Sequence, residues 1–353
     1  MVDIPISQLA VIIQEDRSFA VDTVPVIKPG PGEILVKVHA IAQNPSEWRA
    51  VTYPSVKSGT GTGCDLSGEV IAIGDGKHDT DVAVGDRIAA FVQGSFTPRY
   101  TAFREYAVIP STPLLKIPQN ISYEEAASIP LTACTAVLGL ARLFNFPDIA
   151  PLGRSILVWG GSSSLGQYAI QLARLANLYV IATASPKNFD LVKSFGADAV
   201  IDYRSPDIVS KIIQASPRGE GVDYVFDSIS ENDTIGVASK TFRKDGPRKA
   251  VVVLPISSEA MDNNVEYHFV FIAALLGADA WLGGIYFPNN YQDYELGKAF
   301  YGLISEWLKE GKFKPNPIRV RPGGLRGVPE GIQFMLDGKV SGTKLVYRVS
   351  ETN

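Results

Sequence analysis

A strand that runs directly into a Gly/Ser turn and then a helix is the feature that most limits the fold of this chain. The segment SILVWGGSSSLGQYAIQLARLA, residues 155–176, begins with an apolar β-like run and passes through two glycines and three serines. The apolar residues of its second half recur at helical spacing: Leu165, Tyr168, Ala169, Leu172 and Leu175. The sequence therefore predicts a strand–turn–helix unit of a parallel sheet covered by helices.

Similar units follow along the middle of the chain. Further β-like runs alternate with helical patterns between about residues 123 and 279, at residues 179–183, 199–202, 222–227 and 250–254. This alternation predicts an α/β domain, a Rossmann-type doubly wound parallel sheet at residues 123–287.

The flanking parts have a different rhythm. Up to residue 122, short β-like runs such as EILVKVHAIA are separated by Pro and Gly turns, and a helix and the run TKLVYRV follow residue 288. A chain of 353 residues is longer than a single domain of roughly 150 residues. We therefore expect a second, mostly β domain that combines residues 1–122 with residues 288–353.

The Gly/Ser turn is a candidate site for a dinucleotide. If Gly161 and Gly166 are the outer glycines of a G-x-G-x-x-G pattern, Ser163 takes the middle position. Its side chain limits close approach of the backbone but can itself donate to phosphate. Backbone N–H groups at the start of the helix would bind the phosphate oxygens. The predicted contacts are Gly160, Gly161, Ser162, Ser163, Ser164, Leu165 and Gly166, and an ordinary tight turn is the alternative.

The end of the next predicted strand indicates which dinucleotide is bound. An NAD site commonly has an acidic residue there, about 20 residues beyond the glycines, for the ribose 2′-OH. In ATASPKNFD, residues 182–190, Ser185 and Lys187 come first, and Tyr203 and Arg204 follow the third strand. Hydroxyl, ammonium and guanidinium groups can hold a 2′-phosphate, which a carboxylate would repel. The prediction is NADPH, and the alternative is that these are solvated surface charges.

Composition argues against several classes of partner. The formal net charge of −4 supplies no basic field for nucleic acid or anionic lipid. Two cysteines cannot build a disulfide framework, and the N-terminus lacks the pattern of a secretory signal, so we expect a reducing, cytoplasmic location. The apolar segment 269–287 is interrupted by three glycines, which predicts a buried helix and strand rather than a membrane span.

Several motifs in the right order resemble a known superfamily. They are KPGPGEILVKVHAIAQNPSEWR, GCDLSGEVIAIG, VGDRIAAF, IPLTACTAVLGL, VWGGSSSLGQYAIQLARL, ATASPKNFDLVKSFGADAVIDY and GLRGVPEGIQFMLDGKVSGTKLVYRV. Together they resemble the medium-chain dehydrogenase/reductase superfamily. Within it, the chain is most similar to the zinc-free quinone and enoyl reductases, in particular to fungal trans-acting enoyl reductases that serve polyketide synthases. This resemblance implies that the mostly β domain is GroES-like.

The resemblance also bears on Cys64 and Asp65. Zinc-dependent members of the superfamily have Gly-His-Glu where this chain has Gly63-Cys64-Asp65, and a cysteine in the early loop where this chain reads QNPS, residues 43–46. Catalytic zinc needs three protein ligands, and these two residues offer at most two, so we expect no metal. A nucleophilic cysteine needs an activating base, and none of the three histidines is near in sequence, although spatial proximity stays open. Cys64 is interpreted as a packed residue.

Without zinc to polarise a carbonyl, the resemblance implies reduction of an activated C=C bond. It places the nicotinamide between the domains, near Pro130, Leu131, Thr132 and Thr135. Asn44, Pro45, Thr132 and Leu254 are the remaining predicted cofactor contacts.

The predicted catalytic residues are Thr135, Arg49 and Tyr53. Thr135 would hydrogen-bond the nicotinamide or the substrate, unless it caps or packs a helix. Related enzymes often have Lys where Arg49 stands, and because arginine is a poor proton donor, water is also a candidate proton source. Ordinary surface or packing roles remain the alternative for Arg49 and Tyr53.

The prediction is an NADPH-dependent, zinc-independent reductase of an α,β-unsaturated carbonyl or enoyl thioester. The substrate would be tethered to an acyl carrier domain of a polyketide synthase, whose acidic surface would meet Lys57, Arg99 and Arg104. One alternative is a stand-alone quinone or 2-alkenal reductase, and another is a dinucleotide-binding partner protein without catalysis. The sequence leaves open whether the chain is a monomer or a homodimer.

Overall fold

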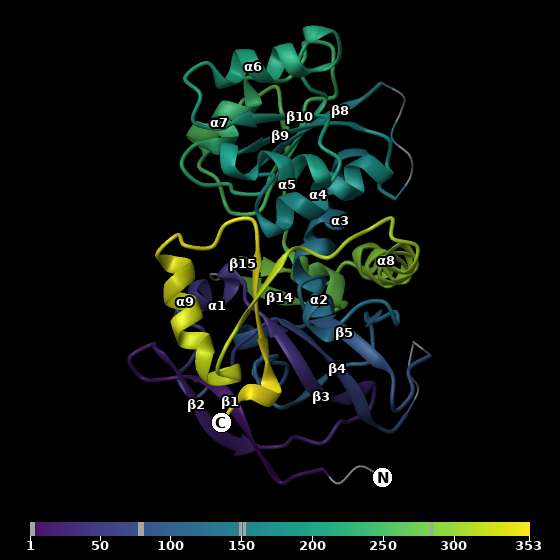
Figure 1. The fold of residues 1–353 in the computed structure, drawn as a ribbon, viewed down its shortest axis with the longest axis vertical. Helices are drawn as coiled ribbons and strands as arrows, with labels where there is room; N and C mark the ends of the chain where they lie inside the picture. Colours follow the sequence, from purple (N-terminus) through teal and green to yellow (C-terminus); the bar gives the residue numbers. More distant parts are fainter. Residues whose placement is uncertain (1–3, 77–80, 148–149, 151–152, 283–284) are drawn as a thin grey trace. The chain divides into compact units, whose positions relative to one another are not determined.

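The computed structural model describes residues 4–76, 81–147, 150, 153–282 and 285–353. These fall into two compact units, whose residues can be followed by the sequence colours of Figure 1. Unit 1 combines residues 1–131 with residues 273–353, and unit 2 is residues 132–272. The predicted boundaries between the two domains lay instead between residues 122 and 123 and between residues 287 and 288. Residues 123–131 fall in unit 1, where Ala127 of helix α2 (Tyr123–Ala127) packs with Ala40, Ala42 and Val346.

Unit 1 is built on a mixed seven-stranded sheet with the order β16-β17-β3-β4-β5-β7, in which β6 also pairs with β3. The strand β3 is long enough to pair with β4 along its length and with β6 and β17 at its two ends. The strands of this sheet are β3 (Glu33–Ala42), β4 (Asp65–Ile73), β5 (Arg87–Phe91), β6 (Tyr106–Pro110), β7 (Leu115–Lys116), β16 (Ile318–Arg321) and β17 (Lys344–Arg348).

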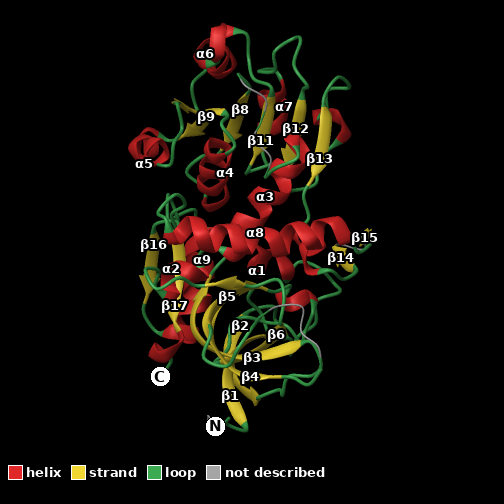
Figure 2. Cartoon of the chain, turned by 90° about the vertical axis from the view of Figure 1, so that its right-hand side faces the viewer, coloured by secondary structure: helices red, strands yellow, loops and turns green. Residues whose placement is uncertain are grey.

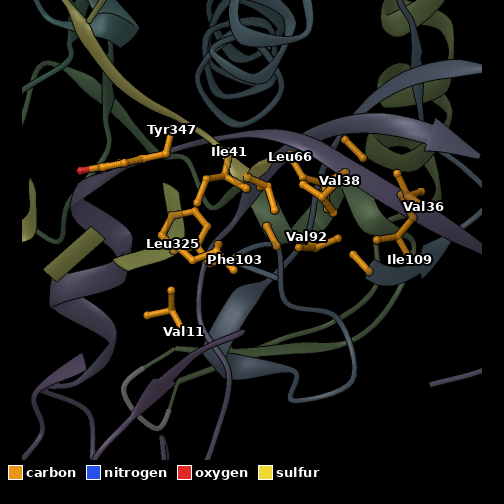
Figure 3. Packing of buried hydrophobic residues seen from close by; sticks show 14 of the residues in the cluster. Val11, Val36, Val38, Ile41, Leu66, Val92, Phe103, Ile109, Leu325 and Tyr347 are labelled. Carbon is orange, nitrogen blue, oxygen red and sulfur yellow. The ribbon is translucent and has the colours of Figure 1, made fainter. Parts of the chain in front are cut away.

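Two further pairs of strands complete unit 1: β1 (Ser7–Ile13) with β2 (Phe19–Pro25), and β14 (Ala280–Leu282) with β15 (Ile285–Phe287). Its helices are α1 (Pro45–Ala50), α2 (Tyr123–Ala127), α8 (Tyr291–Lys309) and α9 (Val328–Leu336). The core of the unit gathers side chains from widely separated parts of the chain, including Val11, Ile41, Phe103, Leu325 and Tyr347 (Figure 3).

Unit 2 contains a six-stranded sheet with the order β10-β9-β8-β11-β12-β13, and every pair in it is parallel. Its strands are β8 (Ser155–Trp159), β9 (Tyr179–Ala184), β10 (Ala199–Asp202), β11 (Tyr224–Asp227), β12 (Lys249–Val252) and β13 (Glu266–Phe269). Its helices are α4 (Ser164–Leu175), α5 (Phe189–Ser194), α6 (Ile208–Ala215) and α7 (Thr234–Ser239), together with most of α3 (Pro130–Phe144) (Figure 2). The predicted α/β class and parallel sheet are confirmed.

Strand order reverses at β8, because the chain moves from β8 through β9 to β10 on one side and then crosses to β11 on the other. In open parallel sheets, ligands bind outside the carboxyl ends of the strands at such a reversal. Helix α4 begins there, directly after β8, so the fold puts the Gly/Ser turn at that position.

The segment 269–287 differs from its prediction. A short 3₁₀ helix, Ile272–Leu276, is followed by the β14–β15 hairpin, which lies outside the six-stranded sheet. Trp281 is 60% exposed and its cross-strand partner Tyr286 is 48% exposed, so the prediction of a buried strand was wrong. Gly283 and Gly284 lie outside the described residues. Within the described part of the chain, no helix is long and apolar enough to span a membrane.

Candidate functional site: a glycine turn and a buried polar network

The turn after β8 requires its glycines. Gly160 has a φ of +79°, and a Cβ there would lie 2.7 Å from the Ser228 Oγ. A Cβ on Gly166 would lie 2.3 Å from the carbonyl oxygen of Gly160, so the start of α4 packs directly on the end of the strand. Such close backbone contact is the role that the third glycine of a dinucleotide-binding turn performs.

Side-chain hydroxyls fix the shape of this turn. The Ser163 Oγ accepts a hydrogen bond from the Gly166 N–H at 2.9 Å and caps α4. It also lies 2.9 Å from the Ser228 Oγ, which donates to the Trp159 carbonyl at 2.6 Å. The Thr183 Oγ1 accepts from the Gly160 N–H at 3.0 Å. The Ser163 hydroxyl is therefore engaged within the protein, whereas the sequence suggested it as a donor to phosphate.

Two backbone donors of the turn remain open. Among the described residues, none accepts a hydrogen bond from the N–H groups of Ser162 and Leu165. Ser162 lies two residues before α4, and Leu165 is the second residue of that helix. The Ser164 Oγ donates to the Thr132 Oγ1 at 3.4 Å, which brings the start of α3 to the same turn. Open N–H groups at the N-terminus of a 12-residue helix fit the phosphates of a dinucleotide.

The predicted 2′-phosphate residues lie near the ends of β9 and β10. Ser185 precedes a short 3₁₀ turn that contains Lys187, whose exposed ammonium has no ion-pair partner among the described residues. Arg204, by contrast, donates to both oxygens of Asp202, at 3.0 and 2.9 Å, and lies 5.6 Å from the Tyr203 ring. Its charge is therefore balanced within the protein.

Asp202 is an acidic residue that the sequence reasoning did not weigh. It is the last residue of β10 and pairs with Ala184, the last residue of β9. The sequence pattern predicts an acid only at the end of β9, but the end of a parallel neighbouring strand lies at the same edge of the sheet. Leu254, two residues after β12, is half-buried.

In unit 1, the end of β3 and the start of β4 hold a buried network of polar side chains. Asp65 accepts hydrogen bonds from the Asn44 Nδ2 at 2.9 Å and from the Leu131 N–H at 2.8 Å. The Lys344 ammonium lies 3.4 Å from the Asp65 Oδ2 and donates to the Asn44 Oδ1. Burial raises the pKa of Asp65, and the Lys344 charge opposes that rise. We call Asn44, Asp65 and Lys344 the buried triad.

Glu47 lies beside the triad and is buried on α1. It accepts from the Asn44 N–H at 2.5 Å and from the Cys64 N–H at 3.2 Å. Burial, reinforced by the negative charge of Asp65, raises its pKa to about 7. Burial also raises the pKa of the Cys64 thiol well above its ordinary value, so the thiolate does not form at neutral pH. Cys64 is a packed thiol 3.4 Å from the Ser46 Oγ, which agrees with its interpretation as a packed residue.

The other predicted residues of unit 1 come from the same segment. Pro45 is exposed at the first position of α1, and the Arg49 guanidinium lies 4.5 Å from the centre of the Trp48 ring. Tyr53 packs edge-on to Phe96, with ring centres 5.6 Å apart. In unit 2, Thr135 is buried on α3, one turn after Thr132.

The three basic residues predicted for a carrier surface are not equivalent. Lys57 is exposed, but Arg99 forms an ion pair with Glu33. Arg104 is only 5% exposed, so its prediction as a surface contact was wrong. Its side chain leaves the surface because it packs over Gly61.

Comparison with known proteins agrees with this architecture. Residues 30–119 match the alcohol dehydrogenase GroES-like domain, and residues 164–264 match the zinc-binding dehydrogenase family. The chain is 33% identical to the trans-enoyl reductase ACTTS2 of Alternaria alternata, over 98% of this chain and 99% of that protein. The chain belongs to the medium-chain dehydrogenase/reductase superfamily. This family prediction and that of a GroES-like domain are confirmed.

Other members of the superfamily are similar over the same length. The trans-enoyl reductase gkaC of Penicillium citrinum is 35% identical, with 98% of this chain and 99% of that protein covered. The structure of the CurK enoyl reductase matches with a TM-score of 0.76 at 20% identity, over 97% of this chain and 99% of that one, which supports the fold.

In the present chain, Thr183 and Ser228 form hydrogen bonds with the glycine turn. Neither residue was predicted from the sequence. Each lies near the carboxyl end of a strand adjacent to β8: Thr183 in β9, and Ser228 directly after β11. Polar residues at these strand ends were therefore an available signal. Among the described residues, no group of three or more His, Cys, Asp or Glu side chains is arranged to hold a metal ion.

Proposed function

We propose that this protein is an NADPH-dependent reductase of activated C=C bonds, acting on an α,β-unsaturated carbonyl or an enoyl thioester. The observation that carries the proposal is the turn after β8, with its open N–H groups, in a chain that is 33% identical over nearly its full length to a trans-enoyl reductase. NADPH, when bound, supplies the hydride that adds to the β-carbon.

The choice of NADPH over NADH rests on Lys187. Its exposed ammonium, unpaired within the described part of the chain, and the Ser185 hydroxyl are suited to a 2′-phosphate. Asp202 would repel that phosphate, but Arg204 neutralises it through a two-point ion pair. Tyr203, which is 46% exposed beside this pair, would offer its ring and hydroxyl to the same end of the cofactor. Leu254 would contribute an apolar contact.

The proposed diphosphate donors are the N–H groups of Ser162 and Leu165, on a turn shaped by Gly160, Gly161 and Gly166. Ser164 and Thr132 border that turn. Ser163 would act indirectly, by capping α4 and keeping those donors in place. Because these donors are fixed before the cofactor arrives, little ordering is required on binding.

For the reaction itself, we propose that Thr135 hydrogen-bonds the nicotinamide or the substrate carbonyl. Asn44 and Pro45 would border the cofactor, with the Asn44 amide held in place by the buried triad. Arg49 and Tyr53 would stabilise the enolate charge that develops as the hydride adds. Protonation would come from Tyr53 or from water, because the Arg49 guanidinium holds its proton too tightly.

We also propose that the reaction does not use zinc. Zinc binds cysteine as thiolate, but Cys64 is a neutral buried thiol. Asp65, the next residue, is committed to Lys344, Asn44 and the Leu131 N–H. The donors available at this position therefore suit packing better than metal ligation.

A carrier-bound substrate is the more specific form of the proposal, by similarity to trans-acting enoyl reductases of polyketide biosynthesis. Lys57 is the exposed cation to which an acidic carrier would bind. The two cysteines are free and buried, as suits a cytoplasmic enzyme.

The test is NADPH consumption measured across enones, quinones, short enoyl thioesters and the same acyl groups on a carrier domain. We expect the highest kcat/KM for carrier-bound enoyl thioesters, because remote binding energy improves positioning. Faster turnover of quinones would favour a general quinone or alkenal reductase. Cofactor binding without turnover of any substrate would favour a binding protein.

A further inference from the structure

Arg104 lies in unit 1 on a segment that pairs with β1, with Arg104 opposite Ala10. The neighbouring residues Phe103 and Val11 both point into the core (Figure 3). Because side chains alternate along an extended chain, Arg104 and Ala10 face the opposite side. That side is also covered, since Ala10 is fully buried and Arg104 is 95% buried, with a 5% exposed fraction.

The Arg104 guanidinium has no partner among the described residues. Its Nε is buried without a hydrogen bond, and no hydrogen bond or ion pair joins its Nη atoms to another described residue. The acid next to it in sequence, Glu105, instead accepts from the Leu9 N–H at 2.7 Å. The charge is therefore neither paired with a carboxylate nor shared with a carbonyl.

A second unsatisfied group lies at the same place. The Thr101 Oγ1 is buried and has no hydrogen-bond partner in the described ranges. A Cβ on Gly61 would lie 2.7 Å from the Thr101 Oγ1 and also 2.7 Å from the Arg104 Nη2, so both atoms converge over this glycine. Thr62, the residue after Gly61, is neutral and buried, and its hydroxyl accepts a hydrogen bond from the buried Ser95 hydroxyl at 3.1 Å.

Such an arrangement is costly unless something binds there. Burial lowers the pKa of Arg104 to about 10, which still leaves the guanidinium charged at neutral pH. A buried charge without a partner is strongly unfavourable, and buried polar groups in proteins are nearly always hydrogen-bonded. An anion that accepts from both groups would remove both penalties.

We propose that Arg104 and Thr101 form a binding site for a small oxyanion, a carboxylate or a phosphate. The planar guanidinium offers a fork of donors that matches two oxygens of such a group, and the Thr101 hydroxyl adds another donor. The small exposed fraction of Arg104 restricts the site to a compact anion or to the anionic end of a larger ligand. The site is distinct from the proposed reductase chemistry and does not depend on it.

The test is the melting temperature of the full chain in sodium acetate and in sodium phosphate, against sodium chloride at equal ionic strength. A ligand that binds the native state raises Tm with the logarithm of its concentration, by about 2 °C for each tenfold increase above Kd. We expect this rise for the wild type in the acetate or the phosphate series, and the series that responds identifies the oxyanion.

Four variants separate binding at this site from general salt effects. Arg104→Leu should abolish the anion-dependent rise, Thr101→Val should reduce it, and Arg104→Lys should retain part of it. Lys57→Leu, at an exposed cation of a neighbouring segment, should respond like the wild type. Equal shifts in the wild type and Arg104→Leu would overturn the proposal. If Arg104→Leu does not fold, an unchanged rise in Thr101→Val and Arg104→Lys together would overturn it instead.

Discussion

The glycine turn of unit 2 and the buried triad of unit 1 hold their polar groups in opposite ways. In the turn, the N–H groups of Ser162 and Leu165 have no acceptor among the residues that the structure describes. In the triad, both oxygens of Asp65 are engaged, by Asn44, Lys344 and the Leu131 N–H. Open donors on a rigid backbone are suited to binding a ligand, whereas a closed network is suited to fixing the shape of the chain around it. This difference in hydrogen bonding separates two groups of residues. Those of the turn are expected to contact the cofactor, and those of the triad are expected to hold neighbouring residues in position.

The largest effect is expected in the triad. Lys344→Met leaves Asp65 buried without its counter-charge and should lower the free energy of unfolding by about 3 to 5 kcal/mol, measured by denaturant titration. Lys339→Met, at an exposed ion pair, is the control and should cost at most about 1 kcal/mol.

The double variant Asp65→Asn with Lys344→Met sharpens this test. Removing both charges should cost less than the sum of the two single changes, because no uncompensated charge remains. Additive losses would mean that the two groups do not interact, and the triad would then be three separate buried residues.

Glu47 gives the second effect, on the dependence of stability on pH. Its pKa in the folded protein is about 7, against an ordinary value of 4.5. Because the folded state binds the proton more tightly, the stabilisation is present below pH 4.5 and is lost as the pH rises to 7. This amounts to about 3 kcal/mol. Unfolding titrations should show this loss in the wild type and not in Glu47→Gln.

The control for Glu47 is Glu259→Gln, which changes an exposed carboxyl and should keep the wild-type profile. If Glu47→Gln also keeps the wild-type slope between pH 4.5 and 7, Glu47 is ionised in the folded protein. The region around the triad would then be more hydrated than its burial indicates.

The third effect concerns the open turn. Gly166→Ala places a methyl group 2.3 Å from the Gly160 carbonyl oxygen, which forces the backbone apart. We expect a loss of about 3 kcal/mol in NADPH binding, roughly 100-fold in Kd, measured by fluorescence titration.

Gly302→Ala on α8 is the matched control, because a Cβ there meets no atom within 4 Å. It should leave NADPH binding unchanged and stabilise the helix by about 1 kcal/mol. Equal NADPH affinity in Gly166→Ala and the wild type would remove the turn from the proposed site.

The smallest effect separates the two cofactors. Lys187→Ala should weaken NADPH binding by about 1 to 3 kcal/mol and leave NADH binding nearly unchanged, because only NADPH carries the 2′-phosphate. Titrating both cofactors against both proteins measures this difference. Tighter binding of NADH than of NADPH by the wild type would refute the assignment of NADPH.

The parallel sheet and the turn could be predicted because their signals are local. The strand β8, the glycines and α4 are contiguous, and β8 begins at residue 155, where the predicted β-like run begins. The triad could not be read in this way, because Lys344 and Asp65 are 279 residues apart and nothing near either residue indicates the other. Asp202 was missed for a related reason, since its nearness to Ala184 comes from pairing between strands.

The β14–β15 hairpin shows another limit of local patterns. Its apolar residues predicted burial, yet Trp281 and Tyr286 pair with each other across the two strands, with ring centres 5.0 Å apart, while both remain about half exposed. Hydrophobicity along the chain does not say which side of a two-stranded ribbon is covered.

The bond from the Leu131 N–H to Asp65 falls where the chain leaves unit 1, one residue into α3. This amide lies at the start of a helix, where no carbonyl of the same helix can accept from it. Exchange of this proton with solvent therefore requires its bond to a carboxylate 66 residues earlier in the chain to open. Fast exchange of this single proton would thus show, without any mutation, that the buried triad opens often.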